Sequence, residues 1–159
     1  GEGRNAVYAA VKGWDVTAFD FSETAVEKAL KLAKLNKVSI KYFVKDIKSF
    51  NYSDYTDYFD VIGVIFAHFK TKERVLFHRN LTGCLNNGGI IVLECFNKNQ
   101  IGNIKNGGPK DVDMLYSKEI LEKDFDNINI VMLEEKSVML DEGVGHKGKC
   151  NVIRMIAYK

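Results

Sequence analysis

The amino-acid sequence predicts an α/β fold: a doubly wound, mostly parallel sheet that ends in a C-terminal antiparallel hairpin. Over the first 93 residues, short apolar segments alternate with helical patterns, as expected of a parallel sheet covered by helices on both faces. The last third contains two longer strand patterns, 129–140 and 150–158, with no helix between them. A chain of 159 residues, 46% of them hydrophobic, can bury one core, so we expect a single domain over 1–159.

Short polar residues and glycines mark the predicted helix ends. Apolar residues at helical spacing predict a helix over 5–12, which Gly13 can end in the left-handed conformation. Ser22 is the expected N-cap of the next helix, which is predicted to stop at Asn36. Thr71 is expected to cap a third helix, and a short helix is expected after Ser117.

Four short apolar segments are predicted as strands. They lie at 15–19, 40–44, 61–65 and 90–93, and the last follows a predicted turn over 86–89. Such segments are apolar on both faces, which is typical of strands in the interior of a parallel sheet.

Composition and charge exclude several classes of function. The net charge of +2 is spread over interspersed acidic and basic residues, so no basic face for nucleic acid is expected. No apolar run reaches the length of a membrane span and no secretory signal is recognisable, so we expect a cytoplasmic protein. The cysteines are odd in number and widely spaced, which favours neither disulfides nor a metal site.

Candidate ligand-binding residues follow the predicted strands. In open parallel sheets, ligands bind beyond the carboxyl ends of the strands. Gly1 and Gly3 open the first helix, Asp20 ends one strand, and Asp46 follows the next. Each alone has an ordinary explanation as a turn, a helix cap or a loop acid. Their joint spacing, continued by Phe66 after the next strand, favours a ligand site.

The residues around these positions resemble class I S-adenosylmethionine-dependent methyltransferases. The segments 1–8 and 13–22 resemble the first two motifs of that family, and 87–94 resembles its turn into a later strand. The segments 107–110, 114–117 and 142–149 resemble the small branch related to the tellurite-resistance methyltransferase TehB. The resemblance spans nearly the whole chain and implies a Rossmann-like methyltransferase fold.

The resemblance also implies S-adenosylmethionine as cofactor. Gly1 and Gly3 would line its methionine and ribose part, and Asp20 would bind the ribose. Phe21 would flank the adenine, and Asp46 with Ile47 would read the adenine edge. The pair Phe66 and Ala67 would lie under the cofactor. The family's strand before Gly1 is absent from this sequence, so we expect the domain to be incomplete at its N-terminus, lacking the first strand.

The methyl acceptor is expected to be a small molecule, including soft sulfur, selenium or tellurium nucleophiles. The segment Phe66-Ala67-His68-Phe69 lacks the proline-containing clamp of enzymes that methylate amide or adenine nitrogens. His68, just beyond a strand end, and His146, on a glycine-rich loop, are the predicted base or acceptor contacts.

Two other functions fit the sequence. The spacing Gly1-x-Gly3-x-x-Ala6, with Asp20 further on, also fits a fingerprint of NAD(P)-dependent oxidoreductases. A protein that binds S-adenosylmethionine without catalysis would keep the same residues. The sequence also leaves open whether the protein is a monomer or a homodimer.

Overall fold

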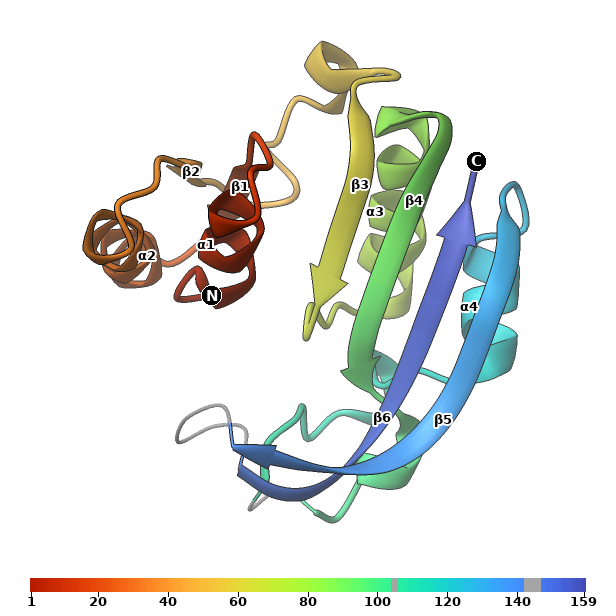
Figure 1. Ribbon diagram of the computed structural model, residues 1–159. Helices are drawn as coiled ribbons and strands as arrows, with labels where there is room; N and C mark the ends of the chain where they lie inside the picture. Colours follow the sequence, from red (N-terminus) through yellow and green to blue (C-terminus); the bar gives the residue numbers. More distant parts are fainter. Residues whose placement is uncertain (104–105, 142–146) are drawn as a thin grey trace. The chain divides into compact units, whose positions relative to one another are not determined.

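The computed structural model describes residues 1–103, 106–141 and 147–159, which divide into two compact units (Figure 1). The first unit is Gly1–Asn51 and the second is Tyr52–Lys159. Each unit has its own sheet.

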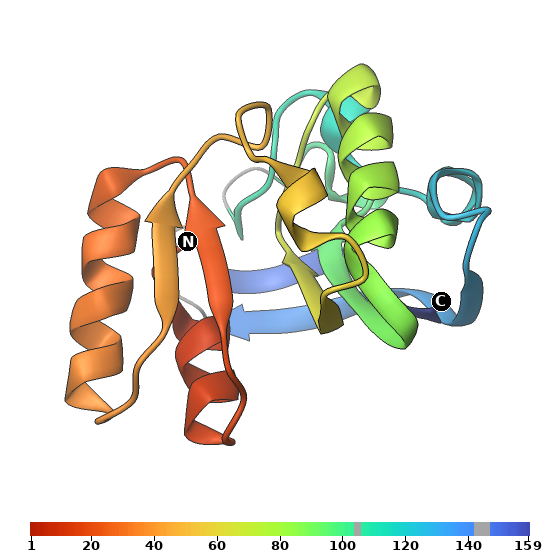
Figure 2. The same ribbon diagram turned by 90° about the horizontal axis from the view of Figure 1, so that it is seen from above.

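The first unit contains two helices and a pair of parallel strands (Figure 2). Its elements are, in chain order, α1 (Arg4–Val11), β1 (Thr17–Asp20), α2 (Glu23–Leu35) and β2 (Lys41–Val44). The predicted cap is confirmed, because the Ser22 hydroxyl accepts a hydrogen bond from the Ala25 N–H at 3.3 Å. Asn36 is the C-cap of α2, and Gly13 follows α1 with a φ of 92°.

Gly3 fixes how α1 begins. Its φ of 81° lies in the left-handed region that favours glycine, and it is the N-cap of α1. A Cβ at this position would lie 2.4 Å from the Cβ of Ala29 on α2. The absence of a side chain at Gly3 therefore lets the start of α1 pack directly against α2.

The second unit is built on a four-stranded sheet of order β3-β4-β6-β5. Its strands are β3 (Phe59–Ile65), β4 (Leu85–Phe96), β5 (Asn129–Asp141) and β6 (Lys147–Tyr158), and its α-helices are α3 (Thr71–Cys84) and α4 (Lys118–Asp124). Short 3₁₀ helices are η1 (Tyr52–Tyr55), η2 (Lys98–Gln100) and η4 (Val112–Met114).

Helices α3 and α4 lie on the same face of this sheet (Figure 1). The alternation of burial along the strands follows from this arrangement. On β4, Ile91 and Leu93 are fully buried, whereas Ile90 and Val92, which point to the opposite face, are more than a third exposed. One part of the core of the unit therefore lies between the sheet and the two helices. A second cluster of buried residues contains Phe96, Leu115, Leu140, Cys150 and Val152.

The predicted fold class is confirmed, with its parallel pairs and its terminal hairpin. Strands β1 and β2 pair in parallel, as do β3 and β4, while β5 and β6 form the antiparallel hairpin. The hairpin joins the sheet through β6, which pairs with β4 in antiparallel orientation. Strands β1 and β3 belong to separate sheets, and the expected lack of a first strand stays a prediction.

Two local predictions were wrong. Thr71 does not cap α3, because the N-cap is Lys70 and the Thr71 hydroxyl instead donates to the Asp113 carboxylate at 2.5 Å. The glycine-containing segment 86–89 is not a separate turn, because β4 already begins at Leu85. The pairing of β4 with β3 is interrupted there by a shift in register, which accommodates the left-handed Gly88.

We predict that Gly3→Ala lowers the free energy of unfolding by about 3 kcal/mol. Left-handed backbone at a non-glycine residue accounts for about 1–2 kcal/mol of this, and the clash with Ala29 for the rest. Gly13→Ala is the matched control, because Gly13 also has a positive φ but a Cβ there would have no atom within 4 Å. Urea unfolding should show a loss at least about 1 kcal/mol smaller for the control. Equal losses would contradict the close packing of Gly3.

Candidate functional site

Two aspartates lie at the same edge of the first unit's sheet. Asp20 is the last residue of β1, and it pairs with Val44, the last residue of β2. Asp46 follows two residues later. Because the strands are parallel, both carboxylates lie at the carboxyl edge of the pair, where open parallel sheets bind ligands.

The Asp20 carboxylate makes contacts on both of its oxygens. Its Oδ1 accepts a hydrogen bond from the Ser22 N–H at 2.9 Å, and its Oδ2 contacts the amino nitrogen of Gly1. The side chain is 18% exposed, so the carboxylate remains accessible from solvent. The structure therefore brings together Gly1 and Asp20, which the sequence had placed at one predicted site.

Tyr42 is a member of this edge that the sequence did not indicate. Its hydroxyl donates to the Gly1 carbonyl oxygen at 2.8 Å. Burial, followed by the negative charge of Asp20, raises the pKa of Tyr42 to about 12, so the hydroxyl stays a donor at neutral pH. A tyrosine within a short strand is ordinary for a β-strand, and no local signal marks it as part of a site.

The remaining residues predicted in the first unit lie around the same edge. Phe21 is 79% exposed, so its ring is free to contact a flat ligand. Asp46 is exposed and its Oδ1 accepts from the Lys48 N–H at 2.9 Å, while Ile47 is half-buried. The fixed Asp46 side chain and the turn that follows it are thus preorganised.

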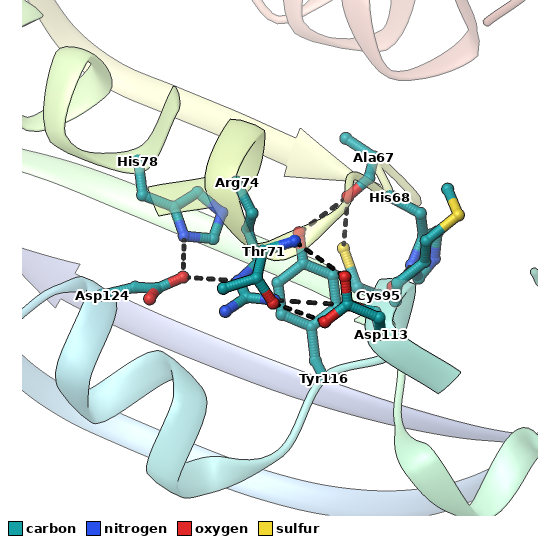
Figure 3. A network of polar contacts seen from close by, with 10 residues as sticks. Ala67, His68, Thr71, Arg74, His78, Cys95, Asp113, Tyr116 and Asp124 are labelled. Carbon is teal, nitrogen blue, oxygen red and sulfur yellow. Dashed lines mark hydrogen bonds and ion pairs between the residues drawn. The ribbon is translucent and has the colours of Figure 1, made fainter. Parts of the chain in front are cut away.

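Phe66 and Ala67 follow β3 in the second unit. Phe66 is half-buried and has a φ of 49°, which is unusual for a bulky residue. Its N–H donates to the Glu94 carbonyl oxygen at 2.7 Å, and its ring lies 4.7 Å from that of Phe96. The Ala67 carbonyl oxygen accepts from the Tyr116 hydroxyl at 2.9 Å (Figure 3). The predicted contact of both residues with a cofactor stays a prediction.

Both ring nitrogens of His68 are bonded to backbone. Nε2 accepts from the Phe96 N–H at 3.3 Å, so the proton is on Nδ1, which donates to the Met114 carbonyl oxygen at 2.8 Å. A base must have an unoccupied lone pair, so this geometry opposes the predicted catalytic role, which the structure does not otherwise test. His146, the second predicted catalytic residue, lies outside the described residues.

A buried ionic network between α3 and α4 was missed by the sequence analysis (Figure 3). One oxygen of Asp124, Oδ2, accepts from Arg74 Nε at 2.7 Å and from His78 Nδ1 at 2.9 Å. The side chains of all three residues are at most 5% exposed. Arg74 and His78 are four residues apart on α3, but Asp124 is distant in sequence, so nothing local predicts the cluster.

The charges of this network follow from burial and pairing. Burial lowers the pKa of His78, although Asp124 partly opposes the shift, and the imidazole is therefore neutral at pH 7. Burial alone would raise the pKa of Asp124, but the hydrogen bonds from His78 and Arg74 outweigh it and lower that pKa. The result is a buried Arg74–Asp124 ion pair with a neutral His78 beside it.

Two kinds of feature are absent from the described residues: a cluster of metal ligands and a membrane-spanning helix. Over 1–103, 106–141 and 147–159, no three His, Cys, Asp or Glu side chains form a group that could hold a metal ion. The three cysteines are free and buried. No helix in these ranges has both the length and the apolar character needed to span a bilayer.

We predict that Asp124→Asn lowers the free energy of unfolding by about 3–5 kcal/mol, because it leaves the buried Arg74 guanidinium without a counter-charge. The matched control is Asp57→Asn, which removes the partner of Lys159 from an exposed pair of 2.6 Å. An exposed pair contributes about 0–1 kcal/mol, so the control should change the urea midpoint little. If the free energy of unfolding of Asp124→Asn fell as little as that of Asp57→Asn, the buried network would not stabilise the unit.

Comparison with known proteins gives a match to one protein family. The family model of the methyltransferase domain matches residues 1–89, more than half of the chain. Among curated proteins, none matches this chain.

Solved structures match the fold over the whole chain at low sequence identity. TehB from Haemophilus influenzae is 20% identical with a TM-score of 0.77, and the match covers 100% of this chain and 55% of TehB. A SAM-dependent methyltransferase from Methanosarcina mazei is 18% identical with a TM-score of 0.77, over 100% of this chain and 88% of that one.

A third match is the N-methyltransferase NodS from Bradyrhizobium japonicum, solved in complex with S-adenosyl-L-homocysteine. It is 14% identical with a TM-score of 0.71, and the match covers 99% of this chain and 73% of NodS. The fold, the strand-end acids and the matched family model together lead to one assignment. The chain belongs to the methyltransferase domain family.

Proposed function

We propose that this protein transfers a methyl group from S-adenosylmethionine to a small-molecule acceptor, and that the carboxyl edge of β1 and β2 binds the cofactor. The observation that carries the proposal is the parallel pairing that puts Asp20 and Asp46 at one edge, beside Gly1. Soft sulfur, selenium or tellurium nucleophiles are the proposed acceptors, as expected of a TehB-like branch.

The residues at this edge fit the cofactor. Gly3 allows the loop before α1 to lie close to α2, whereas a Cβ at Gly1 would have no atom within 4 Å, so a ligand can approach the backbone at Gly1. The Asp20 carboxylate is suited to accept hydrogen bonds from the two ribose hydroxyls, and the exposed Phe21 ring to flank the adenine. Asp46 and the Ile47 N–H are proposed to recognise the adenine edge, and Phe66 and Ala67 are proposed as further cofactor contacts.

When bound, S-adenosylmethionine supplies a methyl group on a positively charged sulfur, which is already activated for transfer. The chain's own residues then have to bind, orient and exclude water. A soft nucleophile that is already ionised, such as a thiolate, needs little base, which agrees with the occupied ring nitrogens of His68. Catalytic contacts by His68 or His146 remain a second proposal, and they matter only for an acceptor that must lose a proton.

We infer that residues 1–159 act as one methyltransferase domain, because solved methyltransferases match along the whole chain. A cytoplasmic location remains an expectation from composition, and the sequence is compatible with either a monomer or a homodimer. A protein that binds the cofactor without catalysis remains the alternative function.

Calorimetry is expected to show binding of S-adenosylhomocysteine and none of NAD. Asp20→Asn should weaken that binding by about 2–3 kcal/mol, or about 30- to 150-fold, because charge-assisted hydrogen bonds to the ribose are lost. The asparagine oxygen can still accept from the Ser22 N–H, so the start of α2 is preserved.

Asp15→Asn is the control, since Asp15 precedes β1 at its other end and pairs with the exposed Lys41. It should bind as the unchanged protein does. Binding of NAD without S-adenosylhomocysteine would refute the function. Binding without methylation of thiols, selenite, tellurite or phenols, followed through S-adenosylhomocysteine release, would favour the non-catalytic alternative.

A further inference from the structure

The backbone at Phe66 is held in an unfavourable conformation by its surroundings. Among the described residues, three non-glycine residues have a positive φ: Lys37, Asp57 and Phe66. The first two are exposed residues in turns, where such angles are common, but Phe66 is an aromatic residue directly after a strand. A conformation of this kind persists only where neighbouring groups fix it, and it is concentrated at functional sites.

The three residues that follow β3 are each fixed by a hydrogen bond to another segment. The Phe66 N–H donates to the Glu94 carbonyl at 2.7 Å. The Ala67 carbonyl accepts from the Tyr116 hydroxyl at 2.9 Å and from the Cys95 thiol at 3.6 Å (Figure 3). His68 bridges to Phe96 and Met114 through its two ring nitrogens, as described above.

Tyr116 is itself held firmly. It is fully buried, its N–H donates to the Phe96 carbonyl at 3.1 Å, and its carbonyl accepts from the Lys98 N–H at 2.9 Å. Its ring lies 5.5 Å from that of His68 and 5.9 Å from the Arg74 guanidinium. Burial raises the pKa of the phenol well above its usual value, so the hydroxyl remains protonated and can donate.

We infer that Tyr116 is a positioning residue for cofactor binding: its hydroxyl holds the Ala67 carbonyl, and thereby the left-handed Phe66, in the conformation that meets the cofactor. This inference rests on the proposed function, in which Phe66 and Ala67 contact S-adenosylmethionine. Tyr116 acts from outside the contact, because its hydroxyl is engaged by the Ala67 backbone.

Tyr116→Phe tests the inference, because it keeps the ring and removes only the hydroxyl. The dissociation constant of S-adenosylhomocysteine, measured by calorimetry well below the unfolding temperature, should rise about tenfold, the effect of one lost hydrogen bond. Cys95→Ala removes the second donor to the same carbonyl. The dissociation constant of S-adenosylhomocysteine should also rise in this variant, but by less than in Tyr116→Phe, because a thiol is a weak hydrogen-bond donor.

Thr82→Val is the matched control for stability. Thr82 is 3% exposed, and its hydroxyl donates to the Arg79 carbonyl at 2.8 Å and accepts from the Asn127 amide at 2.9 Å. The variant should lose stability to urea comparably with Tyr116→Phe, yet bind S-adenosylhomocysteine normally. This comparison separates positioning from a purely structural role.

Each outcome has one meaning. If the unchanged protein does not bind S-adenosylhomocysteine, the proposed function fails. If it binds and all three variants bind equally well, the function stands and the positioning inference is overturned. If Thr82→Val weakens binding as much as Tyr116→Phe, the effect reflects stability alone, and the inference is again overturned. If Tyr116→Phe does not fold, the result for Cys95→Ala decides.

Discussion

Parallel strand pairing is the constraint on which both units of this protein depend. Neighbouring parallel strands end at the same edge, so the residues that follow them are brought together although they are distant in sequence. In the first unit this pairing places Asp20 beside the turn that leads to Asp46. In the second unit, Ile65 of β3 pairs with Glu94 of β4, and the rings of Phe66 and Phe96 beyond them lie 4.7 Å apart. Neither arrangement would survive a reversal of one strand.

The two units stabilise their strand-end residues by different means. In the first unit the turn at Gly1 lies at an open edge, where Tyr42 and Asp20 contact it and Phe21 remains exposed. In the second unit the segment after β3 is enclosed by the end of β4 and by Tyr116. The buried Arg74–Asp124 pair joins the helices behind it. A partly buried acid that solvent can still reach suits ligand binding, whereas the enclosed segment is suited to holding one fixed shape.

The sequence predicted the features that depend on local chemistry. The cap at Ser22, the end of α2 at Asn36 and the left-handed Gly13 each follow from one residue and its neighbours, and all are present. The C-terminal hairpin was also predicted, but the pattern of two strands does not say which of them joins the rest of the sheet. The structure shows that it is β6, inserted between β4 and β5.

Features that depend on contacts between residues distant in the sequence could not be predicted from it. Thr71 has the chemistry of a cap, yet its hydroxyl bonds to Asp113, a contact that only the folded chain creates. The glycine at position 3 was recognised, but not its close approach to Ala29. His68 was predicted as a base because it follows a strand, and the backbone groups that occupy its ring belong to Phe96 and Met114.

The location of the cofactor site is tested most directly by amide NMR shifts of the ¹⁵N-labelled protein during titration with S-adenosylhomocysteine. The largest shifts are expected at Gly3, Phe21 and Ile47, which follow or face the carboxyl edge of β1 and β2. Shifts confined to Lys31, Leu32 and Leu35, which with Glu2 and Arg4 line a groove between α2 and the start of α1, with the amides of Phe21 and Ile47 unmoved, would contradict the proposed site.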